Sequence, residues 1–589
     1  MEWALNRKKQ WLVLVGTTLV LVQVLVNTSG CFREEKRSLL EFKSAYSNHS
    51  LLPSWVDDDD SDSNCCDWER VECDPSSGYV FNLSLSNIRE LDAYGRCSSA
   101  HFNWSLLLTF TELTTLDLSH NCFQNFVCER GLCEMRQIEE LYLNDNEFEG
   151  TLDPLMGNMT SLRTLDLSHN LLSGSIPASI AVMPSLRILN LGHNHFSGSI
   201  PVNMFDGRET SSSETLPHPT GLHILDLSHN KFSGHLPFSF TISPSLVFIN
   251  LKGNNLTGKI PDYYPGGNNI VAIDFSDNKF TGTIPWSIYS LESLTFLLLA
   301  GNHLQDQLSH YICDLRNLQI LDLSRNKFTG SIPSCLNNIA FRDVNFVFSH
   351  GKKASVSADG AKRYRTQIFG FKYRMGEVQV ITKGSSRSYE GDTLKIMSAL
   401  DLSSNQLTGE IPRELGELSS LHALNLSHNH LTGSIPESFC NLENIESMDL
   451  SYNSLSGEIP HDLQDLYYLA IFNVSYNNLS GIAPEGNQFG IFDDSNYEGN
   501  PFLHWTNSNR RIPPSPTPLE KGKKDDCFID LASFYWTFSA SYVTVLLALV
   551  TILWINPYWR SLWFYFVVRF LLKCFGHSLG DGFYKKIMK

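Results

Sequence analysis

The chain lacks the motifs of an enzyme. Among its 589 residues there is no phosphate-binding glycine loop, no protein-kinase signature and no CxxC pair. Positive charge is also scarce, with 45 Lys and Arg against 62 Asp and Glu and a net charge of −17, which argues against a nucleic-acid-binding protein. Asp166, Ser168 and His169 resemble a triad, and His169 with His193 could be metal ligands, but these residues recur with the repeat described below. We therefore predict no catalytic residue, no cofactor and no metal.

What the chain does contain is one phrase repeated at a fixed interval. LRTLDLSHNLLSGSIP runs from Leu162 to Pro177, and related copies begin at Leu186, Leu246, Leu318 and Leu421. A period of about this length indicates stacked coils that bury a continuous core, and hence a solenoid. Solenoids offer extended surfaces, which favours recognition over catalysis. The asparagine of each copy lies mostly 24 residues from the next, at positions 121, 146, 170, 194, 230, 254, 278, 302, 326, 405, 429, 453 and 477.

The residue type at each position of the repeat can be explained by the structure of a coil. Leu165 and Leu167 lie on either side of Asp166, and this period-two alternation predicts a short strand whose leucines point into the core. We expect such strands to stack in parallel along a concave face. Asn170 should bond backbone groups left unpaired where the chain turns, and Gly174 permits a backbone conformation that other residues resist. The predicted fold class is an α/β solenoid with a concave parallel sheet, plus one transmembrane helix.

The two ends of the chain carry apolar segments. Residues 1–30 combine Arg7, Lys8 and Lys9 with an apolar run and small residues, which is typical of a secretory signal peptide. Residues 531–556 are uncharged and long enough to span a bilayer, and the basic excess after them favours a cytosolic C-terminus. The remaining residues, 557–589, are too few for a folded kinase domain. We expect a single-pass type I protein of the plasma membrane with an extracellular N-terminus.

Several sequence features together resemble a known family. The LxGxIP half of the repeat resembles the plant-specific class of leucine-rich repeat. The block from Cys31 to Cys73 resembles the N-terminal cap of plant leucine-rich-repeat receptors, and an insertion before the last four repeats resembles the island of plant receptor-like proteins. The resemblance extends from Cys31 to Arg560 and implies a horseshoe or superhelix. It also implies disulfides Cys31–Cys65 and Cys66–Cys73, a zinc site being disfavoured in a secreted chain.

The resemblance further implies a kinase-lacking receptor, which binds an extracellular peptide or microbe-derived molecule and signals through a receptor kinase, in defence or development. A regulatory decoy or co-receptor, or an extracellular inhibitor of wall-degrading enzymes, stays as the alternative. Small residues at every fourth position of the span could contact a partner helix: Ala540, Thr544 and Ala548. One departure is the lack of a cysteine between Cys440 and Cys527, which leaves the C-terminal cap without the usual disulfide.

The other cysteines are not assigned by the sequence alone. Cys97, Cys122, Cys128 and Cys133 crowd the first repeats and could form further bridges. Cys313 and Cys335 lie on successive coils and could pair, and Cys440 has no obvious partner. Eight sequons support a secretory route: Asn48, Asn82, Asn103, Asn158, Asn255, Asn425, Asn473 and Asn478.

The repeats divide the chain into domains. The insertion differs in charge from the rest, because residues 341–395 carry eleven Lys and Arg against five Asp and Glu. A binding device and a disordered loop are both compatible with this composition. The predicted domains are a signal peptide (1–30), a cap (31–80), repeats (81–336), the island (337–396), four repeats (397–482), a cap remnant with a Pro-rich and acidic juxtamembrane stretch (483–530), the span (531–556) and a tail (557–589).

Ligand contacts are expected from non-consensus side chains on exposed strand positions. On the concave face these are Glu139, Glu140, Tyr142, Arg163, Arg187, His223, Phe248, Lys252, Phe296 and Arg325. In the island the candidates are Arg363, Tyr364, Arg365, Tyr373, Lys383 and Tyr389.

Overall fold

The structure is a computed structural model that describes 31–47, 51–56, 64–88, 100–126, 128, 131–205, 221–237, 245–262, 269–341, 378–382, 385–389 and 397–505. The chain divides into two units, 1–515 and 516–589, and the described residues all belong to the first. The predicted signal peptide, the predicted span with Ala540, Thr544 and Ala548, the tail, Asn48 and Cys97 lie outside them. No helix among the described residues is long and apolar enough to cross a membrane.

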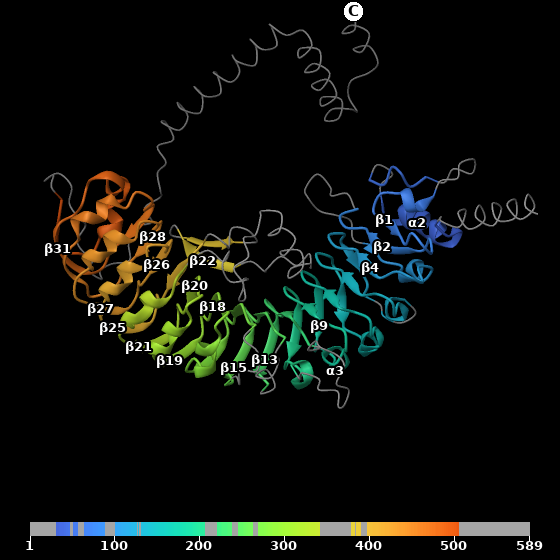
Figure 1. The fold of residues 1–589 in the computed structure, drawn as a ribbon, viewed down its shortest axis with the longest axis horizontal. Coiled ribbons are helices and arrows are strands. Elements are labelled where there is room, and N and C mark those ends of the chain that lie inside the picture. Colours follow the sequence, from blue (N-terminus) through green and yellow to red (C-terminus); the bar gives the residue numbers. More distant parts are fainter. Residues whose placement is uncertain are drawn as a thin grey trace, which may run out of the picture. The chain divides into compact units, whose positions relative to one another are not determined.

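A fifteen-stranded sheet lines the concave side of the solenoid (Figure 1). Its first pair is antiparallel and every later pair is parallel, because each coil adds one strand beside the last. In order the strands are β1 Val71–Cys73, β2 Val80–Ser84, β4 Thr115–Asp117, β6 Glu140–Tyr142, β8 Thr164–Asp166, β10 Ile188–Asn190, β12 Ile224–Asp226, β14 Phe248–Asn250, β16 Ala272–Asp274, β18 Phe296–Leu298, β20 Ile320–Asp322, β24 Ala399–Asp401, β26 Ala423–Asn425, β28 Ser447–Asp449 and β30 Ile471–Asn473.

The LSGxIP half of ten repeats forms a second parallel sheet, which was not predicted from the sequence. Gly174 has a φ of 79°, and a Cβ there would lie 2.8 Å from Thr151 Cγ2. Hydroxyls tie these strands together, as where Ser173 Oγ donates to Gly150 O at 3.1 Å. The ten strands are β7 Glu149–Thr151, β9 Leu171–Gly174, β11 His195–Gly198, β13 Lys231–His235, β15 Asn255–Lys259, β17 Lys279–Gly282, β19 His303–Gln307, β21 Lys327–Gly330, β25 Gln406–Glu410 and β27 His430–Thr432.

Smaller sheets complete the strand inventory of the described residues. A three-stranded sheet continues the second sheet toward the C-terminus, and a two-stranded one lies near the N-terminus. A separate antiparallel hairpin belongs to the island. The strands are β29 Ser456–Glu458, β31 Asn478–Ile482 and β32 Phe502–His504; β3 Ala100–His101 and β5 Phe123–Gln124; and β22 Val378–Thr382 and β23 Ser385–Tyr389.

The convex side is built from short 3₁₀ helices, so the α/β label of our prediction was too helical. Only α2 Arg33–Tyr46 and α3 Ala178–Ala181 are α-helices among the described residues. Proline at the end of LxGxIP favours this tight path because it lacks an N–H donor. The 3₁₀ helices are η1 Cys65–Asp67, η2 Trp104–Leu107, η3 Leu132–Glu134, η4 Pro154–Asn158, η5 Val202–Met204, η7 Trp286–Ser290, η8 His310–Asp314, η9 Ser334–Asn338, η12 Arg413–Glu417, η13 Glu437–Asn441, η14 His461–Asp465, η15 Asn487–Ile491 and η16 Asp494–Tyr497.

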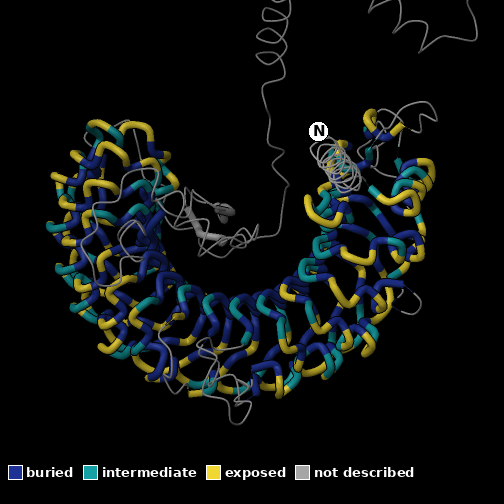
Figure 2. Tube along the Cα trace, turned by 45° about the vertical axis from the view of Figure 1, so that its right-hand side comes forward, coloured by how far each residue is buried: buried dark blue, intermediate teal, exposed yellow. Residues whose placement is uncertain are grey.

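Inside the coils, the repeat asparagines form a ladder, as predicted for Asn170. Its Nδ2 donates to Leu143 O of the preceding coil at 3.0 Å and to Leu167 O of its own coil at 3.1 Å. Its Oδ1 accepts from Phe148 N at 3.0 Å. Leucines such as Leu165 are fully buried beside it, and exposed residues gather on the outer side of the coils (Figure 2). Asn500, which stands outside the repeat consensus, continues the ladder by donating to Val474 O at 2.9 Å.

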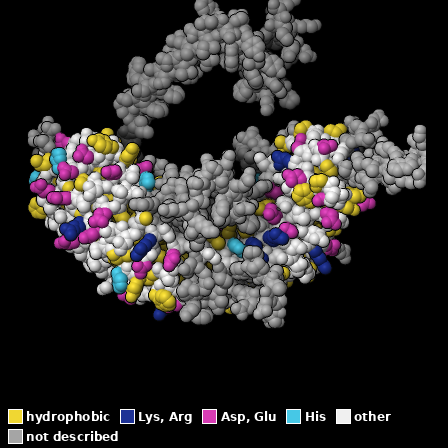
Figure 3. All heavy atoms as spheres, viewed as in Figure 1, with side chains coloured by type: hydrophobic (Ala, Val, Ile, Leu, Met, Phe, Trp, Pro, Cys, Tyr) yellow, Lys and Arg dark blue, Asp and Glu magenta, His cyan; other side chains and the backbone are white. Residues whose placement is uncertain are grey.

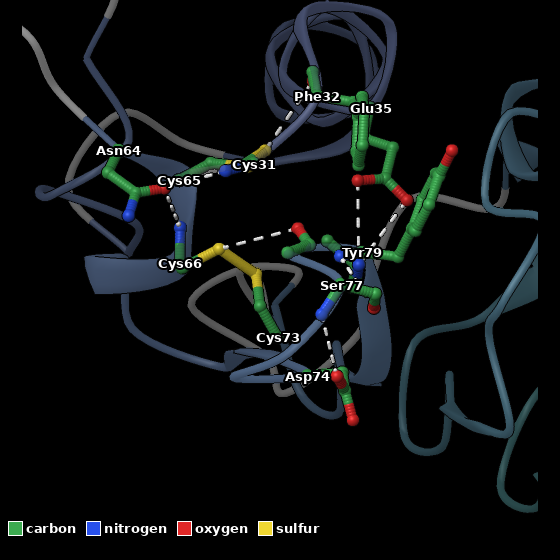
Figure 4. The surroundings of a disulfide bond; sticks show 12 residues. Cys31, Phe32, Glu35, Asn64, Cys65, Cys66, Cys73, Asp74, Ser77 and Tyr79 are labelled. Carbon is green, nitrogen blue, oxygen red and sulfur yellow. Dashed lines mark hydrogen bonds between the residues drawn. A yellow bond between two sulfur atoms is a disulfide. The ribbon is translucent and has the colours of Figure 1, made fainter. Parts of the chain in front are cut away.

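The N-terminal cap covers the first coil with α2. The predicted bridges Cys31–Cys65 and Cys66–Cys73 are both present. Figure 4 shows Asn64 between them, where its Oδ1 accepts from the backbone N–H groups of Cys31 and Cys66 at 2.9 and 3.1 Å. The cap therefore covers the apolar edge of the first coil, which has no neighbouring coil on its N-terminal side, with a helix and a loop held by disulfides.

The remaining cysteines are now partly assigned. Cys313 pairs with Cys335 on the next coil, as the sequence suggested, and Cys128 pairs with Cys133, a pairing that the sequence left unassigned. Cys122 is also disulfide-bonded. Cys440 is a free thiol. At the other end, the C-terminal cap is closed by aromatic packing, with Phe472 on Phe489 at 4.9 Å and Tyr497 against Trp505 at 5.0 Å between ring centroids.

A second polar ladder runs along the concave face at the last residue of most strands, which is Asp or Asn. In several coils an asparagine donates to the aspartate of the preceding coil, as Asn190 Nδ2 does to Asp166 Oδ2 at 3.1 Å. Among the described strands, only β20 and β24 place two aspartates side by side, with Asp322 and Asp401 in register. Burial, and after it the Asp322 carboxylate, raises the pKa of Asp401 to about 7.

Replacing a ladder asparagine should destabilise the solenoid. Asn302→Ala removes the acceptor of Phe280 N (3.0 Å) and the donor to Phe275 O (2.9 Å), leaving buried backbone groups unpaired. We expect a loss of about 2–3 kcal/mol in unfolding free energy, measured by urea denaturation of the purified protein. The matched control is Asn317→Ala, which removes one bond from an exposed side chain and should cost less than about 1 kcal/mol. Equal losses from the two variants would contradict the role of the ladder.

Replacing Asp401 should change the pH dependence of stability. Its pKa is raised in the folded state, so its contribution to stability is present below the unfolded value of about 4 and is lost as the pH rises through about 7. Asp401→Asn removes the ionisation and supplies a donor to Asp322. We expect the variant to gain roughly 1–2 kcal/mol over the parent protein at pH 8 and little at pH 4, measured by urea denaturation at both values. Asp449→Asn, in the same row but beside Asn473, should show no such pH-dependent gain; a gain at pH 8 equal to that of Asp401→Asn would count against the paired carboxylates.

Candidate ligand-binding surface

Three of the predicted residues form a basic row at one edge of the concave sheet. Arg163, Arg187 and His223 each directly precede a strand, and the backbone N–H of each later residue donates to the carbonyl of the earlier one at 2.8 Å. Arg163 Nε lies 3.3 Å from Glu139 Oε2, and both side chains are exposed. Figure 3 shows basic, acidic and histidine side chains gathered together on the inner side of the coils. We call Arg163, Arg187 and His223 the basic row.

Burial and mutual repulsion set the charge of the basic row. Burial, followed by the charge of Arg163, lowers the pKa of Arg187. Burial, followed by the charge of Arg187, lowers the pKa of His223. Both causes favour the neutral imidazole of His223. Two guanidinium groups on a rigid sheet can hold a carboxylate or another planar anion through paired hydrogen bonds.

Glu140 and Tyr142 lie on β6, one coil closer to the N-terminus. Tyr142 Oη donates to Glu140 Oε2 at 3.3 Å, and both side chains are half-buried on the concave face. Burial, followed by the charge of Glu140, raises the pKa of Tyr142. Tyr142 therefore offers a neutral phenol beside a carboxylate, next to the ion pair of Glu139 and Arg163.

Phe248, Phe296 and Lys252 differ from the expectation of exposed side chains. They lie on the concave face but only 6%, 3% and 7% of their surfaces are exposed. The two phenylalanines are the first residues of β14 and β18, and apolar side chains occupy the same position in the strands between and beside them. In the sequence this row is the residue two before the end of each strand, where the strand ends in Asp or Asn except at Leu298 of β18. The apolar row comprises Ile188, Ile224, Phe248, Ala272, Phe296, Ile320, Ala399 and Ala423.

Arg325 lies on a different surface, the ridge formed by the residues that precede the ladder asparagines. These residues have a positive φ, which is 53° for Arg325, and their side chains project from the end of the sheet. Arg325 Nη2 bonds Asp277 Oδ1 at 2.9 Å across Gly301, where a Cβ would collide with both groups. Arg325 therefore lies in an ion pair on the ridge and is not part of the basic row.

The histidines of the ridge stack on one another. The rings of His169 and His193 lie 4.1 Å apart, and those of His193 and His229 lie 4.3 Å apart. Ser168 Oγ donates to Asp166 Oδ1 at 2.7 Å, so the hydroxyl is directed to the carboxylate rather than to His169. Burial, followed by His169 and His229, lowers the pKa of His193 to about 4. No three His, Cys, Asp or Glu side chains within the described ranges are placed to hold a metal ion.

Most island candidates lie outside the described residues: Arg363, Tyr364, Arg365, Tyr373 and Lys383. Tyr389 ends β23, and its backbone pairs with that of Val378 at the start of β22. Strand β22 contacts β26 of the concave sheet. The island therefore returns at least one hairpin to the concave side of the solenoid.

Comparison with known families supports the repeat assignment. Leucine-rich-repeat patterns match 111–125, 136–196, 221–241, 317–339, 397–418, 420–442 and 444–466. The leucine-rich-repeat N-terminal domain matches 33–74, which includes α2 and three of the four cap cysteines.

Related proteins come from plants. Receptor-like protein 13 of Arabidopsis thaliana is 48% identical over 202 residues, which is 33% of this chain and 19% of that protein. Cuscuta receptor 1 of Solanum lycopersicum is 57% identical over 205 residues, or 34% of this chain and 18% of that protein. The matched part thus spans about a fifth of the length of these relatives.

The chain is also similar, at low sequence identity, to two solved structures. The PEPR1–AtPEP1 complex is 22% identical with a TM-score of 0.41, covering 80% of this chain and 82% of that one. The Arabidopsis receptor kinase HAESA, solved with the peptide hormone IDA and the co-receptor SERK1, is 22% identical with a TM-score of 0.37, covering 81% and 99%. From its repeats, its N-terminal domain and its relatives, the chain is a leucine-rich-repeat protein similar to the plant receptor-like proteins.

Proposed function

We propose that this protein is a cell-surface receptor that binds an extracellular ligand on the concave face of its N-terminal coils. The observation that carries the proposal is the basic row beside Glu139, Glu140 and Tyr142, which gathers ionic and phenolic groups on a sheet held rigid by the asparagine ladder. Such fixed groups bind a partner without a large ordering cost. Two neighbouring arginines favour a ligand with a carboxylate or a similar anion, such as a peptide.

We propose that a receptor kinase associates with the ectodomain and the predicted span 531–556 and carries the signal. The similarity to receptor-like proteins supports this assignment. The identity of the ligand decides whether the response is defence or development. Purification of the tagged protein with its bound molecules would identify that ligand.

Neutralising the basic row should weaken ligand capture. In the full-length protein displayed on plant cells, the double variant Arg163→Ala, Arg187→Ala is expected to retain at least about tenfold less of the anionic ligand, because each charge-assisted bond contributes about 1.5–3 kcal/mol. The measurement is mass spectrometry of molecules co-purified from extracellular fluid. Arg413→Ala is the control, since Arg413 is an exposed arginine on the outer η12 helix and its loss should leave capture unchanged. Unchanged capture by the double variant would refute this surface.

Co-purification also tests the signalling step. We expect a receptor kinase to be recovered with the tagged protein from plasma membranes, and a variant lacking 531–589 to lose it. Recovery of a wall-degrading hydrolase in its place would favour an inhibitor and contradict the receptor proposal.

Glycosylation should follow the exposure of the sequons. Asn103, Asn158, Asn255 and Asn478 are exposed, whereas Asn425 is 9% exposed and its Nδ2 donates to Asp401 Oδ2 at 3.2 Å. We predict glycans on the four exposed sites and none on Asn425, measured by glycopeptide mapping of the plant-expressed protein. The two remaining described sites, Asn82 and Asn473, are half-buried with bonded amides and should be modified poorly. Full glycosylation of Asn425 would show that its side chain on the concave face is accessible, and would contradict the prediction.

A further inference from the structure

Two tyrosine rings are stacked on the ridge of the last coils. Tyr452 and Tyr476 occupy the same position in successive repeats, and both have a positive φ, of 51° and 54°. Their rings lie 4.4 Å apart between centroids, at an interplanar angle of 15°. The ring of His428, one coil earlier, stacks on Tyr452 at 4.2 Å. Within the described ranges, no other two tyrosine rings are stacked on each other.

The backbone of the ridge fixes the separation of the two rings. Tyr452 N donates to Ser475 O at 2.9 Å. Asn453 N donates to Tyr476 O at 3.2 Å, so the two coils are bonded on both sides of the Tyr452 carbonyl. Tyr476 also packs against the backbone of the segment that follows it, because a Cβ added to Gly499 would lie 2.7 Å from Tyr476 Cδ1. The Tyr476 ring is thus held between Tyr452 and the Gly499 backbone.

Both phenols reach solvent, and one of them has a carboxylate beside it. Tyr452 is 43% exposed, and Tyr476 is partly exposed. Tyr476 N donates to Glu498 O at 2.6 Å, which places Glu498 next to this ring. Partial burial, followed by the charge of Glu498 and then the Tyr452 phenol, raises the pKa of Tyr476. A carboxylate in this place can accept the phenolic proton when the ring loses an electron.

The coils that carry this tyrosine pair have no disulfide. Residues 397–505 contain one cysteine, Cys440, and it is a free thiol. Earlier in the solenoid, the bond between Cys313 and Cys335 joins two successive coils covalently. A link between the two tyrosines would join two successive coils in the same way, at the end of the ectodomain where no cysteine pair does so.

We propose that Tyr452 and Tyr476 are a site of oxidative cross-linking, where a haem peroxidase and hydrogen peroxide join the two rings as a dityrosine. Each phenol gives up one electron and its phenolic proton, and the two phenoxyl radicals form a bond between ring carbons ortho to their oxygens. The hydrogen atoms on those two carbons then move to the oxygens, which restores both phenols. Hydrogen peroxide takes up the two electrons and two protons and is reduced to two molecules of water. This chemistry does not depend on the proposed receptor function.

Oxidation of the purified full-length protein tests the site. The protein is treated with hydrogen peroxide and a haem peroxidase, reduced, and digested with a protease that cuts after glutamate, because Glu458 lies between the two tyrosines. We expect mass spectrometry to find a joined pair of peptides, containing Tyr452 and Tyr476, that has lost two hydrogen atoms. Because the rings are held side by side, this link should form at least about tenfold faster than any other tyrosine cross-link. Cross-links confined to other tyrosines, or formed between two molecules, would overturn the proposal.

A pair of variants separates stacking from exposure. Tyr476→Phe keeps the ring on the ridge but removes the oxygen from which the radical forms, so the joined peptides should disappear. Tyr467→Phe is the matched control, because Tyr467 is more exposed, at 67%, but precedes β30 and is not on the ridge. Its loss should leave the yield of the link unchanged. Equal losses of cross-linking in the two variants would mean that exposure, and not the stack, selects the tyrosines, and the proposal would be wrong.

The link should also fasten the last coils. A covalent bond across one repeat restricts the unfolded chain, as a disulfide does. We expect the oxidised parent protein to resist proteolysis at 453–475 in urea concentrations at which the oxidised Tyr476→Phe variant is cut. Equal cleavage of the two oxidised proteins would contradict this effect of the link.

Discussion

The asparagine ladder is the constraint on which the rest of this structure depends. Each coil must bend sharply, and each bend leaves backbone groups without a partner inside an apolar interior. Asn170 shows the solution: one side-chain amide bonds carbonyls of two coils and accepts from the backbone of the coil before. Because these bonds reach from one coil to the next, the ladder fixes the register between coils as well as the turn within each.

A fixed register has a functional consequence. Side chains at the same strand position form a straight row across the concave sheet. The residue type in such a row can differ from coil to coil without altering the interior. One row becomes apolar in the middle, another alternates Asp with Asn, and the residues before β8, β10 and β12 form the basic row. Among the described strands, the one pair of neighbouring aspartates, Asp322 with Asp401, occurs where the island interrupts the repeats, since strands separated by the insertion become neighbours.

The features that follow from the repeat period could be predicted from the sequence. The features that depend on contacts between coils could not. The strands, the ladder, the cap bridges and the Cys313–Cys335 pair were predicted from spacing or resemblance and are present. The second sheet was missed because its strands depend on positive-φ glycines and cross-coil hydroxyl bonds. Burial of Phe248 and Phe296 could not be inferred from their own repeats, because strand alternation places both side chains on the concave face, where we expected exposure. Asn500 was missed because it follows no consensus phrase.

The most direct test of this account is to measure hydrogen exchange at the backbone amides that donate to the ladder asparagines. Phe148 N, Phe280 N and Leu407 N donate to asparagine side chains of the following coil at 3.0 Å. If the ladder holds the coils together, these three amides exchange as slowly as those of the concave strands, and only when whole coils open. Exchange at the rate of the outer 3₁₀ turns would mean that the coils are held by leucine packing alone, and the account would be wrong.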